Sequence, residues 1–542
     1  MDPVPGAGAA GTLTADPAGT APVAVPRQPT HDRIGHAFVA VLVLCGTLLR
    51  LRQWWYGRSM WLDELAVAHN IRDSGYGGLL RPLSLNQSAP PAWLWLERLA
   101  YDLLGAGDRA LRMVPLLFGV GLLVLLALLT TPLMPVPARC AVLALAAFNP
   151  WLISYSNQVK QYSSEAFWVT LVVGVGILCA REAGWRRYLA FWCSALGGAV
   201  FSIMAIPVTF LTATLVAATL IRRRGSLLRF AAPAPFVLAV AVGVYVRVLR
   251  PEQANPELKA YWVHAYPDHP LSDLGATAHW LARTYRGLMV VPFSARWHWL
   301  FALLALFAAV VCLRRLGASV LAMLLVPVAL GLAAAALSIY PLSDRLALYA
   351  VPTCLLVLGW AASPPARPTR LAWGRFAAGV ALLGSLLVPQ LGTVATATIR
   401  PAAAFPLGGG GNLVAYRQAI GYIGAHRSAS DLVLGTDALT WYPMSWYGPM
   451  LGAAPARYVE VAPAGVACAP TALADLVRGH TVVWIFEMTA WNEGGNATLI
   501  RILSHYGTPV IGEFQGARVV RFDLTRPAPP GREAGCVTIR PA

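Results

Sequence analysis

Long apolar stretches separated by short connections dominate the chain. A membrane-spanning helix needs roughly 20 mostly apolar residues, and eleven stretches approach that length. The expected spans lie near 36–54, 112–131, 139–155, 164–181, 188–204, 206–221, 230–249, 297–313, 318–339, 346–362 and 376–395. The stretch 188–221 is divided into two short spans only because Ala205-Ile206-Pro207 offers a break there. If this stretch is one long or re-entrant element, the count changes and the C-terminus switches sides.

The connections predict the orientation. Those at 132–139, 181–187, 222–229, 314–319 and 363–375 contain 13 Arg and one acidic residue, Glu182. Basic residues in short loops mark the cytoplasmic side. We therefore expect a cytoplasmic N-terminus, with the long loops 55–111 and 250–296 and the region 396–542 outside the cytoplasm.

Outside the spans the pattern changes. Residues 1–35 are rich in Pro, Ala, Gly and Thr and lack an apolar run, so we expect a disordered cytoplasmic tail. In the first outer loop, Pro90-Pro91 starts an expected helix at 92–104 that Gly105 ends. Its apolar face would lie along a membrane surface.

The region 396–542 is expected to be a separate α/β domain. A helix is expected at 413–426, and short runs typical of strands lie at 431–434, 457–461, 481–486 and 517–524. Cys468 and Cys536 are the only cysteines in this region. If it faces an oxidising compartment, we expect a disulfide between them; two free thiols are the alternative.

The composition supports a membrane protein. Residues are 57% hydrophobic and only 12% charged, whereas soluble domains carry about 25% charged residues. The net charge of +17 belongs mostly to the membrane half, because residues 400–542 contain 11 Arg against 9 acids. Nucleic-acid binding is therefore not expected. The excess of Arg over Lys, with much Ala, Gly and Pro, indicates a GC-rich, bacterial genome.

Candidate chemistry begins at Asp63-Glu64, just beyond the first span. Adjacent carboxylates beside a bilayer are costly unless they are paired or used. One could remove a proton from an acceptor hydroxyl while the other orients it or pairs with a cation. The alternative is a helix-start pair stabilised by the helix dipole.

The surrounding motifs resemble a known family. Trp61-Leu62-Asp63-Glu64, Gln87-Ser88-Ala89-Pro90-Pro91 and Arg109-Ala110-Leu111-Arg112 are similar to the first loop of GT-C-fold membrane glycosyltransferases. The nearest group is the protein-mannosyltransferase-like one around glycosyltransferase family 39, which includes the lipid A aminoarabinose transferases. The resemblance implies a polyprenyl-phosphate sugar donor, with Asp63 as catalytic base and Glu64 as its partner.

Two basic residues are candidates for the donor phosphate. Lys160, in the segment Tyr155–Tyr162, is a cation in a chain that otherwise almost always uses Arg; interfacial snorkelling is the alternative. Arg345 lies in an outer turn and could hold a phosphate bidentately; a local pair with Asp344 or a lipid headgroup is the alternative. Further candidates for substrate contact are Gln87, Gln158, Tyr162, Glu165 and Tyr340.

The expected activity is inverting transfer of a hexose or pentose to an envelope glycan, lipid or protein at the outer face of the cell membrane. No strong metal motif is present, so no cofactor is required, although a divalent metal stays open. A transporter or flippase for a lipid-linked saccharide is one alternative. A non-catalytic, glycan-binding assembly subunit is another.

Overall fold

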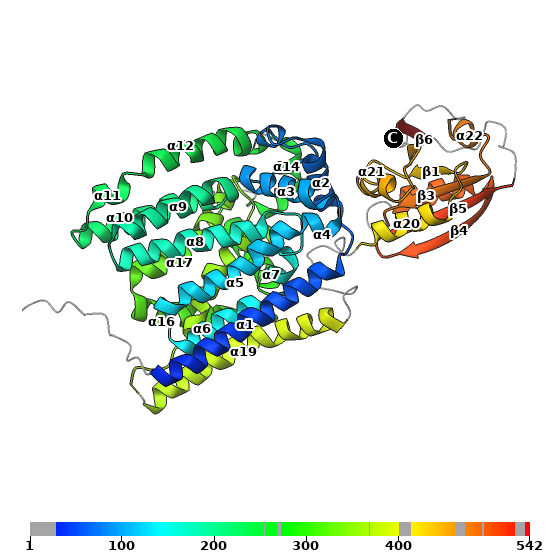
Figure 1. Cartoon of the computed structure of the whole chain (residues 1–542). Helices are drawn as coiled ribbons and strands as arrows, with labels where there is room; N and C mark the ends of the chain where they lie inside the picture. Colours follow the sequence, from blue (N-terminus) through cyan, green and yellow to red (C-terminus); the bar gives the residue numbers. More distant parts are fainter. Residues whose placement is uncertain are drawn as a thin grey trace, which may run out of the picture.

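The computed structural model describes residues 29–253, 255–267, 273–367, 369–399, 414–461, 472–489, 493–525 and 537–541. A bundle of helices forms the larger part, and a sheet-containing domain lies beyond one end of it (Figure 1). Both α1 (Pro29–Tyr56) and α19 (Arg370–Ile399) end at the side of the bundle that faces this domain. The chain is therefore a polytopic helical membrane protein with a C-terminal α/β domain.

Within the described residues, nine helical segments are long and apolar enough to cross a membrane. Besides α1 and α19 they comprise α4–α5 (Asp108–Leu111, Met113–Leu133), α8 (Tyr162–Arg181), α10 (Ala205–Arg222), α11–α12 (Leu227–Ala231, Ala234–Val244), α16 (His298–Leu316), α17 (Ala318–Ala336) and η4–α18–η5 (Asp344–Ala350, Val351–Leu358, Gly359–Ala362). The count of eleven is not confirmed.

Two expected spans are helical but short. The stretch 139–155 is divided into α6 (Val136–Phe148) and α7 (Pro150–Tyr155). Asn149 causes this division, because its side chain accepts hydrogen bonds from the N–H groups of Trp151 and Leu152 and so caps a new helix. The stretch 188–204 is α9 (Trp185–Phe201), which has 17 residues.

The uncertain stretch 188–221 contains two helices. Helix α9 ends at Phe201 and α10 begins at Ala205, with the Ser202 hydroxyl accepting a hydrogen bond from the Ala205 N–H. Pro207 lies in the first turn of α10, where its missing N–H leaves no helical bond unmade. The break is therefore real, slightly before the expected position.

The first outer loop folds into α2 (Leu62–Asp73), η1 (Gly78–Leu80), α3 (Pro91–Leu104) and α4. The expected helix at 92–104 is confirmed, and Gly105 ends it at a φ of +84°. Its expected apolar face is divided: Trp93 and Leu94 are buried in the protein, whereas Leu103 is 73% exposed.

The second outer loop follows η2 (Tyr245–Leu249) and contains α13 (Arg250–Gln253), α14 (Pro256–Tyr261), η3 (Val263–Ala265) and α15 (Leu274–Val290). It contacts the first loop. The Asn86 side chain donates a 2.5 Å hydrogen bond to Glu257 and accepts one of 2.9 Å from Asn255.

The C-terminal domain has a six-stranded sheet in the order β4-β5-β3-β1-β2-β6. The strands β1 (Leu432–Gly435), β2 (Arg457–Val461) and β3 (Val482–Glu487) are mutually parallel, and β4 (Gly507–Phe514), β5 (Ala517–Leu524) and β6 (Val537–Pro541) pair antiparallel. All four expected strands are present, whereas β4 and β6 were not expected. Cys468 and Cys536 lie outside the described residues, so their disulfide stays a prediction.

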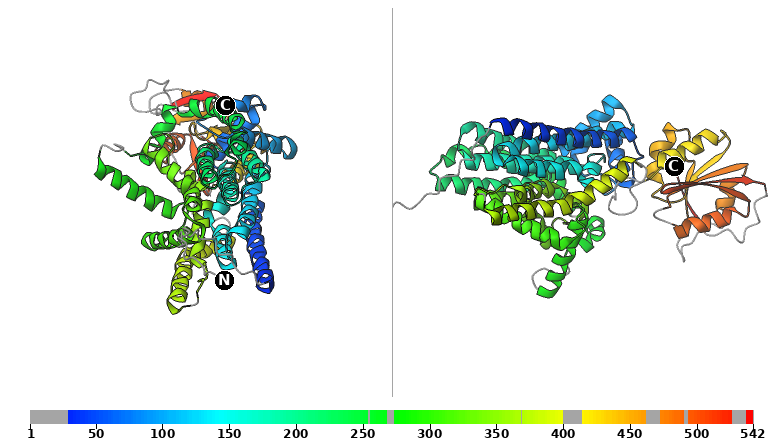
Figure 2. Two further views of the ribbon diagram at one scale, coloured as in Figure 1. Left: turned by 90° about the vertical axis from the view of Figure 1, so that its left-hand side faces the viewer. Right: turned by 90° about the horizontal axis from the view of Figure 1, so that it is seen from below.

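Helices cover both faces of the sheet (Figure 2). On one face lie α20 (Tyr416–His426), within the expected 413–426, and α21 (Trp441–Met450). On the other lie α22 (Ala472–Val477) and α23 (Glu493–Leu503). The face of the sheet that carries α20 and α21 also packs against the first outer loop. Met60, Trp61 and Leu65 belong to the same hydrophobic cluster as Ile420 and Met444. The loop and the domain therefore share one core.

Candidate functional site

Asp63 and Glu64 lie in the first turn of α2. Consecutive residues on an α-helix point about 100° apart, so the two carboxylates face different surroundings. The Glu64 side chain is fully buried, whereas that of Asp63 is 24% exposed. The helix thereby separates two residues that are equivalent in the sequence.

Glu64 is saturated with hydrogen bonds. Its two oxygens accept from Arg112 Nε at 2.9 Å and Nη2 at 2.8 Å. The backbone N–H groups of Val159 and Trp61 also donate to it, at 2.9 and 3.3 Å. Burial raises the pKa of Glu64, but Arg112 and Arg58 outweigh it and hold that pKa below its ordinary value. Glu64 therefore links α2, the junction of α4 and α5 at Arg112, and the segment before α8.

Asp63 makes a different pair. Its Oδ2 lies 2.7 Å from Arg345 Nη2, while Arg345 Nε donates to the Tyr162 hydroxyl at 3.1 Å. The Arg345 guanidinium also lies over the rings of Trp61 and Trp262, at 5.4 and 5.6 Å from their centroids. The partly exposed Asp63 carboxylate is thus paired with Arg345, whose guanidinium is itself positioned by two aromatic rings and a hydroxyl group.

Lys160 lies beside this pair. Its side chain is buried, and Nζ lies 2.5 Å from Gln87 Oε1, an acceptor in the first loop. Burial lowers the pKa of Lys160 to about 8, although the nearby Asp63 opposes the shift. This ammonium has no bonded carboxylate among the described residues, which leaves its charge available to an anionic ligand.

The other residues expected to contact substrate differ in how they relate to Asp63, Lys160 and Arg345. Tyr162 belongs to the Asp63–Arg345 network, and Gln87 holds Lys160. Gln158 is buried, with its Oε1 unbonded and its Nε2 3.4 Å from Ser154 Oγ. Glu165 is buried with Oε1 unbonded, and Tyr340 is half-buried beside Tyr349; among the described contacts neither bonds Asp63, Lys160 or Arg345.

The C-terminal domain holds the segment that leads to α2, which sequence reasoning missed. The Tyr447 hydroxyl accepts from the Met60 N–H at 2.8 Å and donates to Asp108 at 2.6 Å. Arg417 forms an ion pair with Asp108 and donates to the Gly57 carbonyl at 2.8 Å. No local pattern could reveal these partners, because they are more than 300 residues apart.

A second contact fixes the far end of α2. The His69 ring lies 4.5 Å from that of Trp441, and Nε2 lies 3.1 Å from the Tyr442 carbonyl. Burial lowers the pKa of His69 to about 4. Nδ1 is 2.8 Å from Arg72 Nη2, so it accepts while Nε2 donates. His69 thus joins α2 to α21 as a neutral ring.

Among the described residues, no group of three or more His, Cys, Asp or Glu side chains lies together as metal ligands. The polar centre of the site is instead the carboxylate Asp63 with the two cations Arg345 and Lys160.

The chain is a membrane protein of the GT-C fold. Two solved structures are similar to it: ArnT from Cupriavidus metallidurans in the apo state, and the same protein bound to undecaprenyl phosphate. They are 14% identical to this chain, with TM-scores of 0.51 and 0.53. The matches cover 90% and 91% of this chain and 97% and 98% of ArnT. No family model matches the sequence, and no curated protein matches it.

Proposed function

We propose that this chain is a membrane glycosyltransferase that moves a sugar from a polyprenyl-phosphate donor to a hydroxyl of a glycan, lipid or protein. The observation that carries the proposal is the pairing of Asp63 with Arg345 at 2.7 Å, beside the ammonium of Lys160. This set provides one base and two phosphate-binding cations. The likeness to ArnT, one structure of which holds undecaprenyl phosphate, supports a lipid-phosphate donor.

The site is proposed to face away from the cytoplasm. The basic connections favour a cytoplasmic N-terminus, and α1 carries the chain from there to the end of the bundle where α2 lies. On that side polyprenyl-linked sugars are available and nucleotide-activated sugars are not.

In the proposed first step the donor phosphate binds Lys160 and Arg345. A guanidinium can hold a phosphate bidentately, whereas an ammonium acts as a point charge. As the phosphate draws Arg345 away, Asp63 loses its partner and becomes available as a base. Donor binding therefore prepares the carboxylate that the chemistry needs.

In the second step the acceptor hydroxyl gives its proton to Asp63 while its oxygen attacks the anomeric carbon. The bond between that carbon and the phosphate oxygen breaks, its electron pair stays with the phosphate, and the configuration inverts. Arg345 and Lys160 offset the charge of the departing lipid phosphate. Glu64 holds the base in position and takes no proton, because its oxygens are occupied by Arg112 and backbone N–H groups.

The test uses the full chain in lipid nanodiscs with a panel of polyprenyl-phosphate hexoses and pentoses. Mass spectrometry would measure the release of free polyprenyl phosphate in the presence of envelope extracts as acceptor. Asp63→Asn is expected to reduce release by about 10²–10⁴-fold, whereas Asp73→Asn, at the end of the same helix, is expected to leave it near wild type.

Near-wild-type release by Asp63→Asn would exclude Asp63 as the base. In sealed proteoliposomes, movement of a donor across the bilayer without its consumption would instead establish a flippase. Glycan binding with neither consumption nor movement would establish an assembly subunit.

A further inference from the structure

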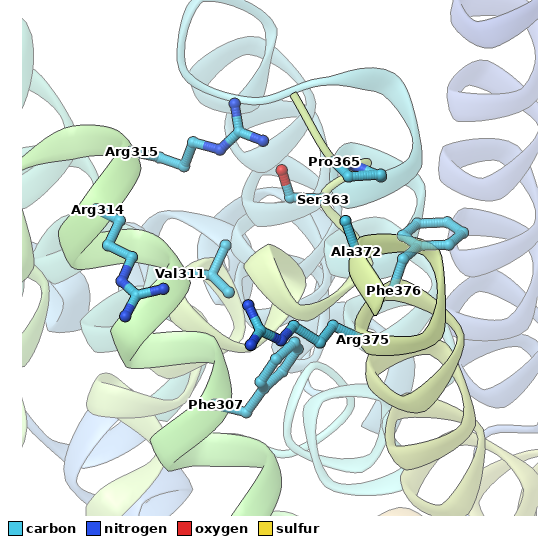
Figure 3. Close-up of a pocket in the computed structure, with 9 residues that line it drawn as sticks. All are labelled: Phe307, Val311, Arg314, Arg315, Ser363, Pro365, Ala372, Arg375 and Phe376. Carbon is cyan, nitrogen blue, oxygen red and sulfur yellow. The ribbon is translucent and has the colours of Figure 1, made fainter. Parts of the chain in front are cut away.

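A basic pocket lies between the end of α16 and the start of α19 (Figure 3). Its volume is about 160 Å³, and Arg314, Arg315 and Arg375 contribute three guanidinium groups to its lining. No acidic residue lines it. A single water needs only about 10–15 Å³ of such volume, so the space accommodates a larger polar group.

The polar groups of this pocket have unused bonding capacity. Arg315 donates a 2.8 Å hydrogen bond to the Pro364 carbonyl, which fixes its position. Arg314 and Arg375 form neither a hydrogen bond nor an ion pair with any residue that the structure describes. The buried hydroxyl oxygen of Ser363 likewise has no hydrogen-bond partner within those residues. A ligand with several acceptor oxygens would satisfy these donors.

The remaining wall is apolar and belongs to helices that face the lipid. Phe307 of α16 and Phe376 of α19 contribute aromatic rings to the lining (Figure 3). Only 22% and 17% of the most apolar windows of α16 and α19 are buried in the protein. On α16, Leu306 and Val310, next to the lining residues Phe307 and Val311, and Leu303, one turn further on, are exposed. A ligand there would meet charge at one end and hydrocarbon at the other.

The pocket is separate from the Asp63 site. Arg375 is in the second turn of α19, whose other end, at Ile399, lies on the side of the C-terminal domain (Figure 1). The pocket is therefore in the opposite half of the bundle, next to the basic connections 314–319 and 363–375.

We propose that this pocket binds the headgroup phosphate of an anionic phospholipid of the leaflet opposite the Asp63 site. The phosphate oxygens accept from Arg314, Arg375 and Ser363, and the acyl chains lie along α16 and α19. A soluble anion would bind the guanidinium groups but not the apolar wall, whereas a phospholipid would contact both with its phosphate and its acyl chains. The proposal is independent of the glycosyltransferase activity.

The experiment measures binding of fluorescent phosphatidylglycerol to the purified full chain in detergent, with unlabelled lipids as competitors. Wild type is expected to bind it, with phosphatidylglycerol competing at least tenfold better than phosphatidylcholine. Arg314→Gln/Arg375→Gln is expected to weaken binding by about tenfold or more, because each Arg near a membrane surface adds attraction to anionic lipid. The matched control is Arg222→Gln/Arg224→Gln, two exposed Arg of another basic connection, expected to bind as wild type.

Ser363→Ala keeps all charges and is expected to weaken binding by a few-fold, which tests the pocket even if the double variant fails to fold. Equal binding by wild type and a folded Arg314→Gln/Arg375→Gln variant would overturn the proposal, as would an equal loss in the control. Displacement of the lipid by millimolar inorganic phosphate, with phosphatidylcholine competing as well as phosphatidylglycerol, would indicate a free-anion site and also overturn it.

Discussion

Tyr447 of the C-terminal domain donates a 2.6 Å hydrogen bond to Asp108, a residue 339 positions earlier at the start of a membrane span. The same hydroxyl accepts the Met60 N–H, three residues before Asp63. One buried side chain therefore connects the domain, the membrane helix and the segment that leads to the candidate base.

Tyr447→Phe is expected to destabilise this junction by about 1–3 kcal/mol, because Asp108 and the Met60 N–H each lose a partner in a buried place. Thermal unfolding would measure the loss, and sugar transfer is expected to fall as the segment before Asp63 loosens. Tyr422→Phe, on an exposed position of α20, is the control. Unchanged unfolding and transfer in Tyr447→Phe would show that this hydroxyl does not hold the loop.

Glu64→Gln is expected to damage folding, because Arg112 would keep a buried charge without its counter-charge. Removal of one partner of a buried pair costs about 3–5 kcal/mol. Glu182→Gln is the control: it removes the exposed pair Glu182–Arg187 and is expected to lower the free energy of unfolding by less than about 1 kcal/mol. A Glu64→Gln variant as stable as Glu182→Gln would contradict the structural role.

The same ion pair predicts a dependence of stability on pH. The folded-state pKa of Glu64 is depressed, so its contribution is present above the unfolded pKa of about 4.3. That contribution is lost as the pH falls through the depressed folded-state value. Wild type and Glu64→Gln should therefore differ in unfolding free energy at pH 7 and converge under acid conditions. A constant difference would contradict this assignment.

Arg345→Ala is expected to lower kcat/KM for the donor by about 10- to 100-fold, the usual effect of losing a hydrogen bond to a charged group. Arg345→Lys should recover part of it, since the charge stays and the bidentate geometry is lost. Arg296→Ala, at an exposed Arg that ends the second outer loop, serves as control. Steady-state kinetics with each substrate varied would decide: a change in the acceptor KM alone would contradict the phosphate role.

The lowered pKa of Lys160 predicts that donor affinity decreases at alkaline pH. Its pKa is lowered to about 8, and a bound phosphate favours the protonated form, so donor affinity should fall as the pH rises above 8. The decline approaches tenfold per pH unit until the pKa of the complex is reached. In Lys160→Arg the side chain stays charged and the decline is expected to disappear. Donor binding measured from pH 7 to 10 would test this, and an identical decline in both proteins would exclude Lys160.

Local signals predicted much of the fold. Helix α3 was expected because Pro and Gly mark its ends, and strands β1, β2, β3 and β5 because their apolar runs are buried. Strand β4 was missed: it contains Pro509 and Gly512 and is largely exposed, so its sequence resembles a loop. The span at 139–155 was predicted too long because hydropathy does not register the helix cap at Asn149.

The site could be predicted only in part. The residues Asp63, Lys160 and Arg345 were identified from motifs, and the structure brings them together. Only the family resemblance distinguished Asp63 from Glu64; the residue pattern could not, because their difference arises from partners at Arg345 and Arg112 on different sides of α2. Tyr447 and Arg417 carry no local signal, since their roles depend on contacts with residues hundreds of positions away.

The shared core of the first loop and the C-terminal domain also sets an order of maturation. Ser59 donates a hydrogen bond to Gln418, 359 residues later in the chain. During synthesis, every helix of the bundle is therefore made before this partner of the loop exists. Without the C-terminal domain, Met60, Trp61 and Leu65 lack the apolar partners that α20 and α21 contribute to their cluster. The packing of the loop that carries Asp63 is therefore complete only after the C-terminal domain has been made and has folded against it.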